Sequence, residues 1–140
     1  MKVSFQYLAG LFDGEGSIGI YPHHRGRMSL RTQLVQNKNK NTFPLLQYLS
    51  KRYGGTLPPQ KSVSGKWKVN WQLSSERALL FLRDIYPYLV IKREQAAIAI
   101  AWQQSRPKAF RDSEGHFASY PDHAKDRRVA KQLKRMKKIR

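Results

Sequence analysis

Two acidic residues, Asp13 and Glu15, lie near the end of the segment Leu8–Gly16, which reads Leu-Ala-Gly-Leu-Phe-Asp-Gly-Glu-Gly. The sixty residues after Glu15, 16–75, contain ten Lys or Arg and no Asp or Glu. Carboxylates can hold a divalent metal ion, and such an ion activates water and relieves charge on a phosphate. Acids beside a long basic stretch are the residue types that metal-dependent hydrolysis of a polyanion, such as a phosphodiester, requires.

Other routes to hydrolysis have little support in the sequence. The four histidines lie in expected loops without metal-ligand spacing; they are His23, His24, His116 and His123. There is no cysteine, which excludes disulfides and thiolate metal sites, and no group of side chains suggests an activated nucleophile.

Positive charge is concentrated in two parts of the chain. The net charge is +18 overall, with +10 on residues 16–75, +1 on 76–122 and +8 on 123–140. This distribution points to a polyanionic partner. A basic protein kept soluble by its charge is the alternative, but sixty residues without one acid argue against it. The acid-free segment does not have a helical pattern, so binding to a membrane surface is not expected.

The composition fits a single globular domain, since 140 residues with 40% hydrophobic content can bury a core. No apolar run is long enough to span a bilayer, and the first residues lack the apolar stretch of a signal peptide. We expect a soluble intracellular protein of the cytoplasm, nucleoid or organelle matrix, not a secreted one.

Helical spacing of apolar residues predicts five helices. The first covers 5–12 and ends at Gly14 and Gly16, and its two apolar stripes indicate that both faces are buried. The second is capped by Asn41-Thr42 and closed by Gly54-Gly55. The others are expected from Ser74-Ser75 to Pro87, over 92–104 and over 122–140, with a loop over 105–121.

Alternating patterns predict two β-hairpins, 17–36 and 56–73, in which one side of each strand is apolar. The resulting order α-β-β-α-β-β-α-α favours an α+β fold with an antiparallel sheet and helices on one face. The other face carries side chains able to contact phosphates and bases: Tyr21, His23, Arg27, Ser29, Arg31, Gln33, Lys66, Lys68, Asn70 and Gln72. Neighbouring loop and strand residues extend this set: Arg25, Lys40, Gln60 and Lys61. An ordinary solvated sheet face is the alternative, although such faces usually include acids.

The segment Leu8–Gly16 closely resembles the LAGLIDADG motif of homing endonucleases, and the element order is also that of the family. The resemblance covers residues 1–104, leaving 105–140 as a basic extension. It implies an α-β-β-α-β-β-α core whose curved sheet forms a saddle for double-stranded DNA. The implied activity is site-specific double-strand cleavage of a long pseudo-palindromic target, with the reading frame placed in an intron.

The resemblance also assigns roles to motif residues. Glu15 and the Gly14 carbonyl would bind Mg²⁺, while Asp13 could bind the metal or only backbone groups at the helix end. A single motif implies a homodimer in which two copies of the motif helix pack together. The interface residues would be Tyr7, Gly10, Leu11 and Asp13.

Two further catalytic positions follow from the family pattern. Gln36 matches a glutamine near the end of the second strand, and Lys92 matches a lysine before the fourth helix, with Arg93 as its competitor. Lys40 could join the same basic pocket. The alternative function is a non-cleaving binder of this fold, such as an intron RNA maturase or a DNA-binding regulator. Residues 125–140 are expected to form a basic helix along the DNA backbone, or else a disordered tether.

Overall fold

A computed structural model describes residues 2–23, 27–106, 110–111, 117–118 and 123–138. The elements, in chain order, are α1 (Phe5–Glu15), β1 (Gly16–Pro22), β2 (Met28–Asn37), α2 (Thr42–Tyr53), β3 (Pro59–Lys61), β4 (Trp67–Ser74), α3 (Ser75–Ile85), the 3-10 helix η2 (Tyr86–Tyr88), α4 (Arg93–Gln104), β5 (Phe110–Arg111), β6 (Phe117–Ala118) and α5 (His123–Lys138). The predicted α+β class and the order of the core elements are confirmed.

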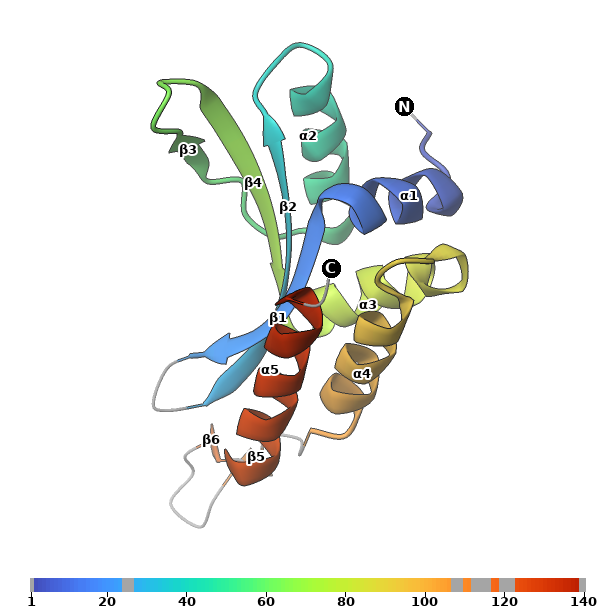
Figure 1. Ribbon diagram of the computed structural model, residues 1–140, viewed down its shortest axis with the longest axis vertical. Helices are drawn as coiled ribbons and strands as arrows, with labels where there is room; N and C mark the ends of the chain where they lie inside the picture. Colours follow the sequence, from blue (N-terminus) through green and yellow to red (C-terminus); the bar gives the residue numbers. More distant parts are fainter. Residues whose placement is uncertain (1, 24–26, 107–109, 112–116, 119–122, 139–140) are drawn as a thin grey trace.

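The four-stranded sheet has the order β1-β2-β4-β3, with every neighbouring pair antiparallel. The two hairpins are joined through β2 and β4, where Thr32 pairs with Leu73 and Gln36 with Val69. The edge strands are therefore β1 and β3. Figure 1 shows α1 to α4 on one side of this sheet, and no helix within the described residues lies across the other side.

Burial along the strands follows the predicted alternation. Leu30 and Leu34 of β2 and Trp71 of β4 face the helices and are buried, whereas Arg31 and Gln33 on the other side are partly exposed. The period of two in the sequence therefore determines which side of the sheet meets the helices and which keeps polar side chains near solvent.

An aromatic cluster fills the core between the sheet and the helices. The Phe81 ring contacts Phe12, Trp71 and Tyr53 in edge-to-face geometry, with ring centroids 5.4, 5.0 and 5.2 Å away. The Tyr53 hydroxyl donates a hydrogen bond to Asp84 at 2.7 Å. Burial, reinforced by this carboxylate, raises the pKa of Tyr53. The cluster connects α1, α2, α3 and β4, so α1 is fixed on the sheet.

Two helix boundaries differ from the sequence predictions. Helix α1 continues through Gly14 to Glu15 and ends only at Gly16, because a mid-helix glycine costs only about 1 kcal/mol and the helix is held by buried Leu8 and Phe12. A Cβ on Gly16 would lie 2.1 Å from the Phe12 ring, so the chain can turn into β1 here only with glycine.

The cap of α2 also differs from the prediction. Asn39 is the capping side chain, since its Oδ1 accepts from the backbone N–H groups of Asn41 and Thr42 at 2.8 and 2.9 Å. The other end of α2 closes as predicted at Gly54, whose φ of +84° favours glycine.

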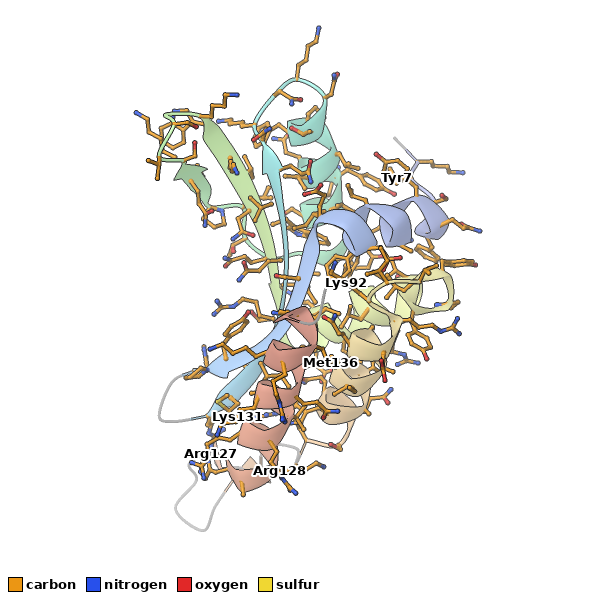
Figure 2. The ribbon with its side chains drawn as sticks, viewed as in Figure 1. Tyr7, Lys92, Arg127, Arg128, Lys131 and Met136 are labelled. Atoms are coloured by element: carbon orange, nitrogen blue, oxygen red, sulfur yellow. The ribbon has the colours of Figure 1, made fainter. Side chains whose placement is uncertain are left out.

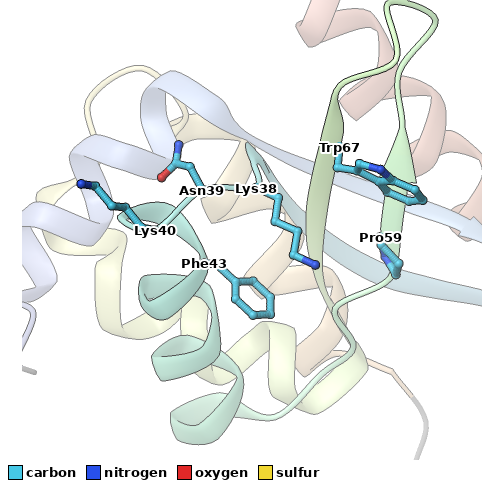
Figure 3. A pocket seen from close by; sticks show the side chains of 6 residues that line it. All are labelled: Lys38, Asn39, Lys40, Phe43, Pro59 and Trp67. Carbon is cyan, nitrogen blue, oxygen red and sulfur yellow. The ribbon is translucent and has the colours of Figure 1, made fainter.

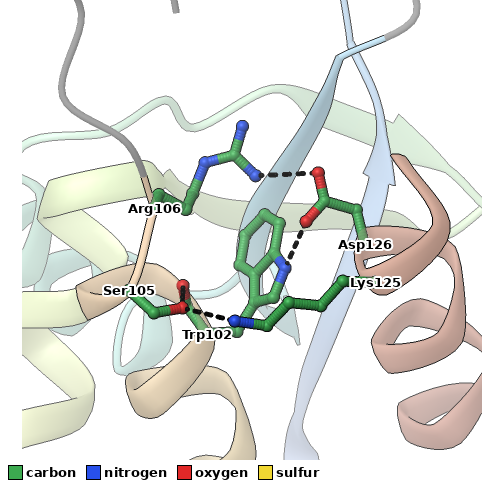
Figure 4. Close-up of polar contacts among 5 residues, drawn as sticks. All are labelled: Trp102, Ser105, Arg106, Lys125 and Asp126. Carbon is green, nitrogen blue, oxygen red and sulfur yellow. Dashed lines mark hydrogen bonds and ion pairs between the residues drawn. The ribbon is translucent and has the colours of Figure 1, made fainter. Parts of the chain in front are cut away.

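Helix α5 confirms the expected C-terminal helix and packs against the core. Leu133 is fully buried, and α5 contacts β1 and α4. The buried Asp126 accepts from Trp102 Nε1 at 2.8 Å and pairs with Arg106 at 3.7 Å, and Lys125 Nζ donates to Ser105 Oγ at 3.3 Å (Figure 4). Burial lowers the pKa of the Arg106 guanidinium, and Asp126 opposes this shift. In the predicted loop, Phe110–Arg111 and Phe117–Ala118 pair as short strands, and the remainder of 107–122 lies outside the described residues.

Within the described part of the chain, no helix combines the length and apolar character needed to cross a membrane.

Candidate active site

The two motif acids have opposite environments at the end of α1. Asp13 lies on the inner face of the helix with only 8% of its surface exposed, whereas Glu15, the last helical residue, is exposed. The bend at Gly16 places Glu15 where the helix meets the first strand of the sheet.

Asp13 fastens α1 to the turn before α4. Its Oδ2 accepts the backbone N–H of Val90 at 2.8 Å, and its Oδ1 accepts that of Lys92 at 2.9 Å. Both carboxylate oxygens therefore bond to backbone donors. This geometry agrees with the second of the two expected roles for Asp13, bonding to backbone groups, and gives the side chain a structural task.

Lys92 completes this connection from the other side. Only 1% of its surface is exposed, and its Nζ donates to the backbone carbonyl of Asp13 at 2.6 Å. An ammonium here meets the negative end of the α1 dipole. Arg93 is instead exposed, with its guanidinium 5.2 Å from the centre of the Tyr86 ring. The structure thus brings Lys92, and not Arg93, to the end of α1 (Figure 2).

Gln36 lies inside the paired part of β2, opposite Val69. The family pattern had placed this glutamine near the end of the second strand, and β2 ends one residue later, at Asn37. Its alternation with buried Leu34 puts Gln36 on the inner, helix-covered side. Because Leu34 pairs with Gly16, Gln36 extends two residues beyond the start of β1, toward the last turn of α1, which contacts β2.

The end of α1 offers oxygen donors of the kind that Mg²⁺ prefers. The Glu15 carboxylate and the Gly14 carbonyl belong to exposed residues in the last turn, where the helix dipole is negative. No group of three or more His, Asp or Glu side chains among the described residues could hold a metal ion. Two donor groups are too few for an ion that takes six oxygens, so a full site needs water, substrate or a second chain.

The outer face of α1, one of the two faces expected to be buried, is open in this single chain. Tyr7 is 56% exposed, Leu11 is half-buried, and a Cβ added to Gly10 or Gly14 would meet nothing within 4 Å. Figure 2 shows Tyr7 on the first turn of α1, and this residue lines an open pocket with Val3, Asn41 and Leu45. Helix α1 therefore has an open face on which two glycines, Gly10 and Gly14, would let another backbone approach closely.

Two exposed apolar side chains in the turn before α4 were not singled out by the sequence analysis. Val90 and Ile91 are 81% and 66% exposed, and the Val90 backbone is bonded to Asp13 of α1. The signal was the apolar run Leu89-Val90-Ile91 directly before Lys92, which has no helical or strand pattern to bury it.

Polar side chains of the uncovered sheet face contact one another across the strands. The Arg31 guanidinium lies 5.0 Å from the centre of the Tyr21 ring, and Lys137 Nζ of α5 lies 3.4 Å from the Tyr21 hydroxyl. Gly19 leaves room for this ring, since a Cβ there would lie 2.5 Å from it. Cations from the sheet and from α5 thus meet at one tyrosine.

One residue predicted for this face is not freely available. Asn70 is on the expected side of β4, but only 2% of its surface is exposed, because it lies between neighbouring strands. Its Nδ2 donates weakly to Gln33 Oε1 at 3.4 Å, and its Oδ1 has no hydrogen-bond partner. Asn70 can therefore influence a ligand on this face only by orienting the Gln33 side chain, or by touching a ligand that lies directly against the sheet.

The other predicted contact residues divide into three groups. Lys61 pairs with Trp67 and lies on the opposite side of the sheet from Lys68, while Arg25 lies outside the described residues. The remaining positions are partly or fully exposed along the sheet face and its ends: His23, Arg27, Ser29, Lys40, Gln60, Lys66, Lys68 and Gln72.

Solved structures with this arrangement match most or all of the chain. The homing endonuclease I-CvuI, in complex with the I-CreI target, matches with a TM-score of 0.63 and 16% identity over 94% of this chain and 80% of that chain. The homing endonuclease I-TnaI matches with a TM-score of 0.50 and 18% identity over 100% of both chains. The LAGLIDADG meganuclease I-AabMI, bound to uncleaved DNA, has a TM-score of 0.54 and 18% identity over 73% of this chain and 36% of its own.

The protein has the LAGLIDADG homing endonuclease fold. No family model and no curated protein matches the sequence itself. In this chain the motif Leu8–Gly16 forms most of helix α1 and the first residue of β1, so Glu15 lies where that helix joins the sheet.

The two acids should respond differently to loss of charge. Asp13→Asn replaces one acceptor oxygen with an NH2 group that must face a backbone N–H, so we expect the free energy of unfolding to fall by about 1–3 kcal/mol. Glu15→Gln should change it by less than about 0.5 kcal/mol. Urea denaturation of both variants measures this difference. Equal losses would contradict the structural role of Asp13.

Proposed function

We propose that this protein is a site-specific homing endonuclease that acts as a homodimer and makes double-strand breaks in a long pseudo-palindromic DNA target. The reaction is Mg²⁺-dependent phosphodiester hydrolysis. The proposal rests on the different environments of the two acids at the end of α1. Both carboxylate oxygens of Asp13 accept backbone N–H groups, from Val90 and Lys92, whereas the Glu15 carboxylate is exposed beside the sheet.

DNA binding follows from the charge and shape of the sheet face. The segment 16–75 supplies ten cations and no acid, and Arg31, Gln33 and Lys68 are on the uncovered side. The neighbouring structures of this fold include complexes with target DNA, which supports the same substrate here. Phosphate contacts from Lys and Arg would give affinity, and Arg or Gln contacts to base edges would give specificity.

Chemistry is assigned to the α1 terminus. The Glu15 carboxylate and the Gly14 carbonyl would hold Mg²⁺, which supplies charge neutralisation at the phosphate and an activated water. The I-CvuI complexes, determined with 2 mM Mg and with 2 mM Ca, are consistent with use of a divalent metal in this fold. Lys92 adds positive charge at the same helix end, and Gln36 would orient water from the second strand.

A second copy supplies the missing half of the site. The open face of α1, with Tyr7, Gly10 and Leu11, would pack against the same face of the partner under two-fold symmetry. Each chain then contributes one Glu15. The exposed Val90 and Ile91 would extend the contact, so that association would also stabilise the turn that carries Lys92. Two-fold symmetry makes the target pseudo-palindromic.

The first test is Glu15→Gln. We expect cleavage, assayed on a library of pseudo-palindromic duplexes and then on the recovered target, to fall at least about a hundredfold, because the only exposed motif carboxylate is lost. DNA affinity should stay within about twofold. Glu94→Gln, which neutralises an exposed acid on α4, is the matched control and should cut normally. Tight binding with no cut by the unaltered protein would favour a maturase or regulator.

The second test concerns association. Gly10→Leu fits the single chain, since a Cβ at Gly10 meets nothing within 4 Å, and it should raise helix stability slightly. In the dimer it would hold the two helices apart. Sedimentation equilibrium should change from dimer to monomer, with cleavage lost, whereas Gln47→Leu on exposed α2 should remain dimeric. A monomeric unaltered protein bound to DNA would contradict the homodimer.

The third test concerns α5, for which we propose contacts to the DNA backbone. Lys131 and Lys134 are exposed and lie beside Gly19 and Tyr21 of β1, so they extend the basic sheet face past its edge. The double variant Lys131→Gln/Lys134→Gln should lower the slope of log affinity against log salt by about 1–2 and leave sequence preference unchanged. Removing the helix would be a poorer test, because Leu133 belongs to the core.

Lys51→Gln/Arg83→Gln removes the same charge from α2 and α3 and should leave the salt slope unchanged. Equal slopes for all three proteins would show that α5 makes no phosphate contacts.

A further inference from the structure

A pocket of about 630 Å³ opens beyond the end of β2, where the loop to α2 passes the beginning of β4 (Figure 3). Its walls come from the loop, from the first turn of α2 and from the edge hairpin: Lys38, Asn39, Lys40, Phe43, Pro59 and Trp67. Every one of these residues belongs to the acid-free segment 16–75. The pocket therefore combines apolar wall residues with a positive electrostatic field.

Trp67 is the feature of this pocket that the fold leaves unexplained. It is 51% exposed, whereas Trp71 and Trp102 are 2% and 3% exposed. Alternation along β4 directs Trp67 to the same side as buried Val69 and Trp71, but it lies at the strand end, past the helices that cover them. Most tryptophans are largely buried, so a half-exposed indole in a pocket suggests a binding surface.

Each of the two rings has a lysine beside it. Lys61 Nζ lies 5.9 Å from the centre of the Trp67 ring, and Lys38 Nζ lies 5.1 Å from that of Phe43. Figure 3 shows Lys38 reaching between Phe43 and the strands that carry Pro59 and Trp67. Aromatic faces that stack bases, next to cations that attract phosphates, are how proteins hold single-stranded nucleic acid.

This surface is separate from the sheet face assigned to duplex DNA. Lys61 pairs with Trp67, and Gln60 pairs with Lys68, so the two pairs project to opposite sides of the hairpin. A duplex lying on Arg31, Gln33 and Lys68 would leave the Trp67 ring uncovered. In addition, a stacked base needs an unpaired nucleotide, since bases in a duplex already stack on each other.

We propose that this pocket binds an unpaired nucleotide of a single-stranded RNA or DNA segment, with its base stacked on Trp67 and its phosphates beside Lys38, Lys40 and Lys61. The site is independent of cleavage and would serve a nuclease and a non-cleaving binder alike. It would let the protein hold a single strand while the sheet face holds a duplex.

The test uses labelled 12-nucleotide oligo(U) and oligo(dT), which do not pair with themselves, in fluorescence anisotropy at low salt. We expect the unaltered protein to bind at least one of them. Trp67→Ala should weaken that binding at least about fivefold, Lys38→Ala should also weaken it, and Trp67→Phe should restore part of it. Val63→Ala, at a fully exposed position in the same hairpin turn, is the matched control and should bind normally. Glu15→Gln should also bind normally, which separates this result from the test of cleavage.

Tighter binding of oligo(U) would identify the ligand as RNA, and tighter binding of oligo(dT) would identify it as DNA. Equal binding would show that the pocket recognises the base and the phosphates common to both. Each of these outcomes supports the proposal. Undiminished binding by both Trp67→Ala and Lys38→Ala would overturn it. So would displacement of the oligonucleotide by an equimolar DNA duplex, which would place the contact on the sheet face. Self-association that disappears in Trp67→Ala would show instead that a second copy covers the ring. If Trp67→Ala does not fold, Trp67→Phe and Lys38→Ala still decide the question.

Discussion

The Asp13 carboxylate is the interaction on which the rest of the site depends. It receives two backbone N–H groups from the turn before α4, and the carbonyl of the same residue receives the Lys92 ammonium. A buried carboxylate without such donors would be strongly unfavourable, so this turn must stay in place for α1 to remain packed. The same contact leaves the next acid, Glu15, facing solvent. Asp13 therefore has a structural role, and Glu15 keeps an exposed carboxylate at the same helix end.

The sheet depends on a similar constraint, because β2 and β4 join the two hairpins in a fixed register. A slip of one residue would exchange Leu30, Thr32 and Leu34 with Arg31 and Gln33 and place cations against the helices. Burial of the Phe12, Trp71 and Phe81 cluster excludes that alternative. The uncovered face is therefore as firmly specified as the core, although none of its side chains supplies much packing energy.

The sequence predicted the elements well, because the apolar periods of 2 and 3.6 along the chain directly record which side of each strand and helix is buried. It predicted poorly wherever a long-range contact decided the outcome. The passage of α1 through Gly14 depends on Phe12 packing, the α2 cap depends on Asn39 reaching forward, and the burial of Asn70 depends on neighbouring strands. For the site, the motif itself indicated Glu15, but the bonds from Asp13 to residues 77 and 79 positions away have no local signal. The exposed pair Val90–Ile91 did have a local signal, an apolar run without a helical or strand pattern, and was overlooked.

Helix α5 carries a single acid, Asp126, and that acid is turned inward to Trp102 and Arg106. The exposed side of α5 therefore has cations and no carboxylate, so no negative charge of this helix reduces its positive electrostatic field. Attraction of this kind acts at a distance and does not discriminate between base sequences. On a long duplex it would keep the protein close to the strand between encounters and shorten the search for one rare site by allowing movement along the DNA. The buried aspartate would in this way influence how fast a target is found, without touching it.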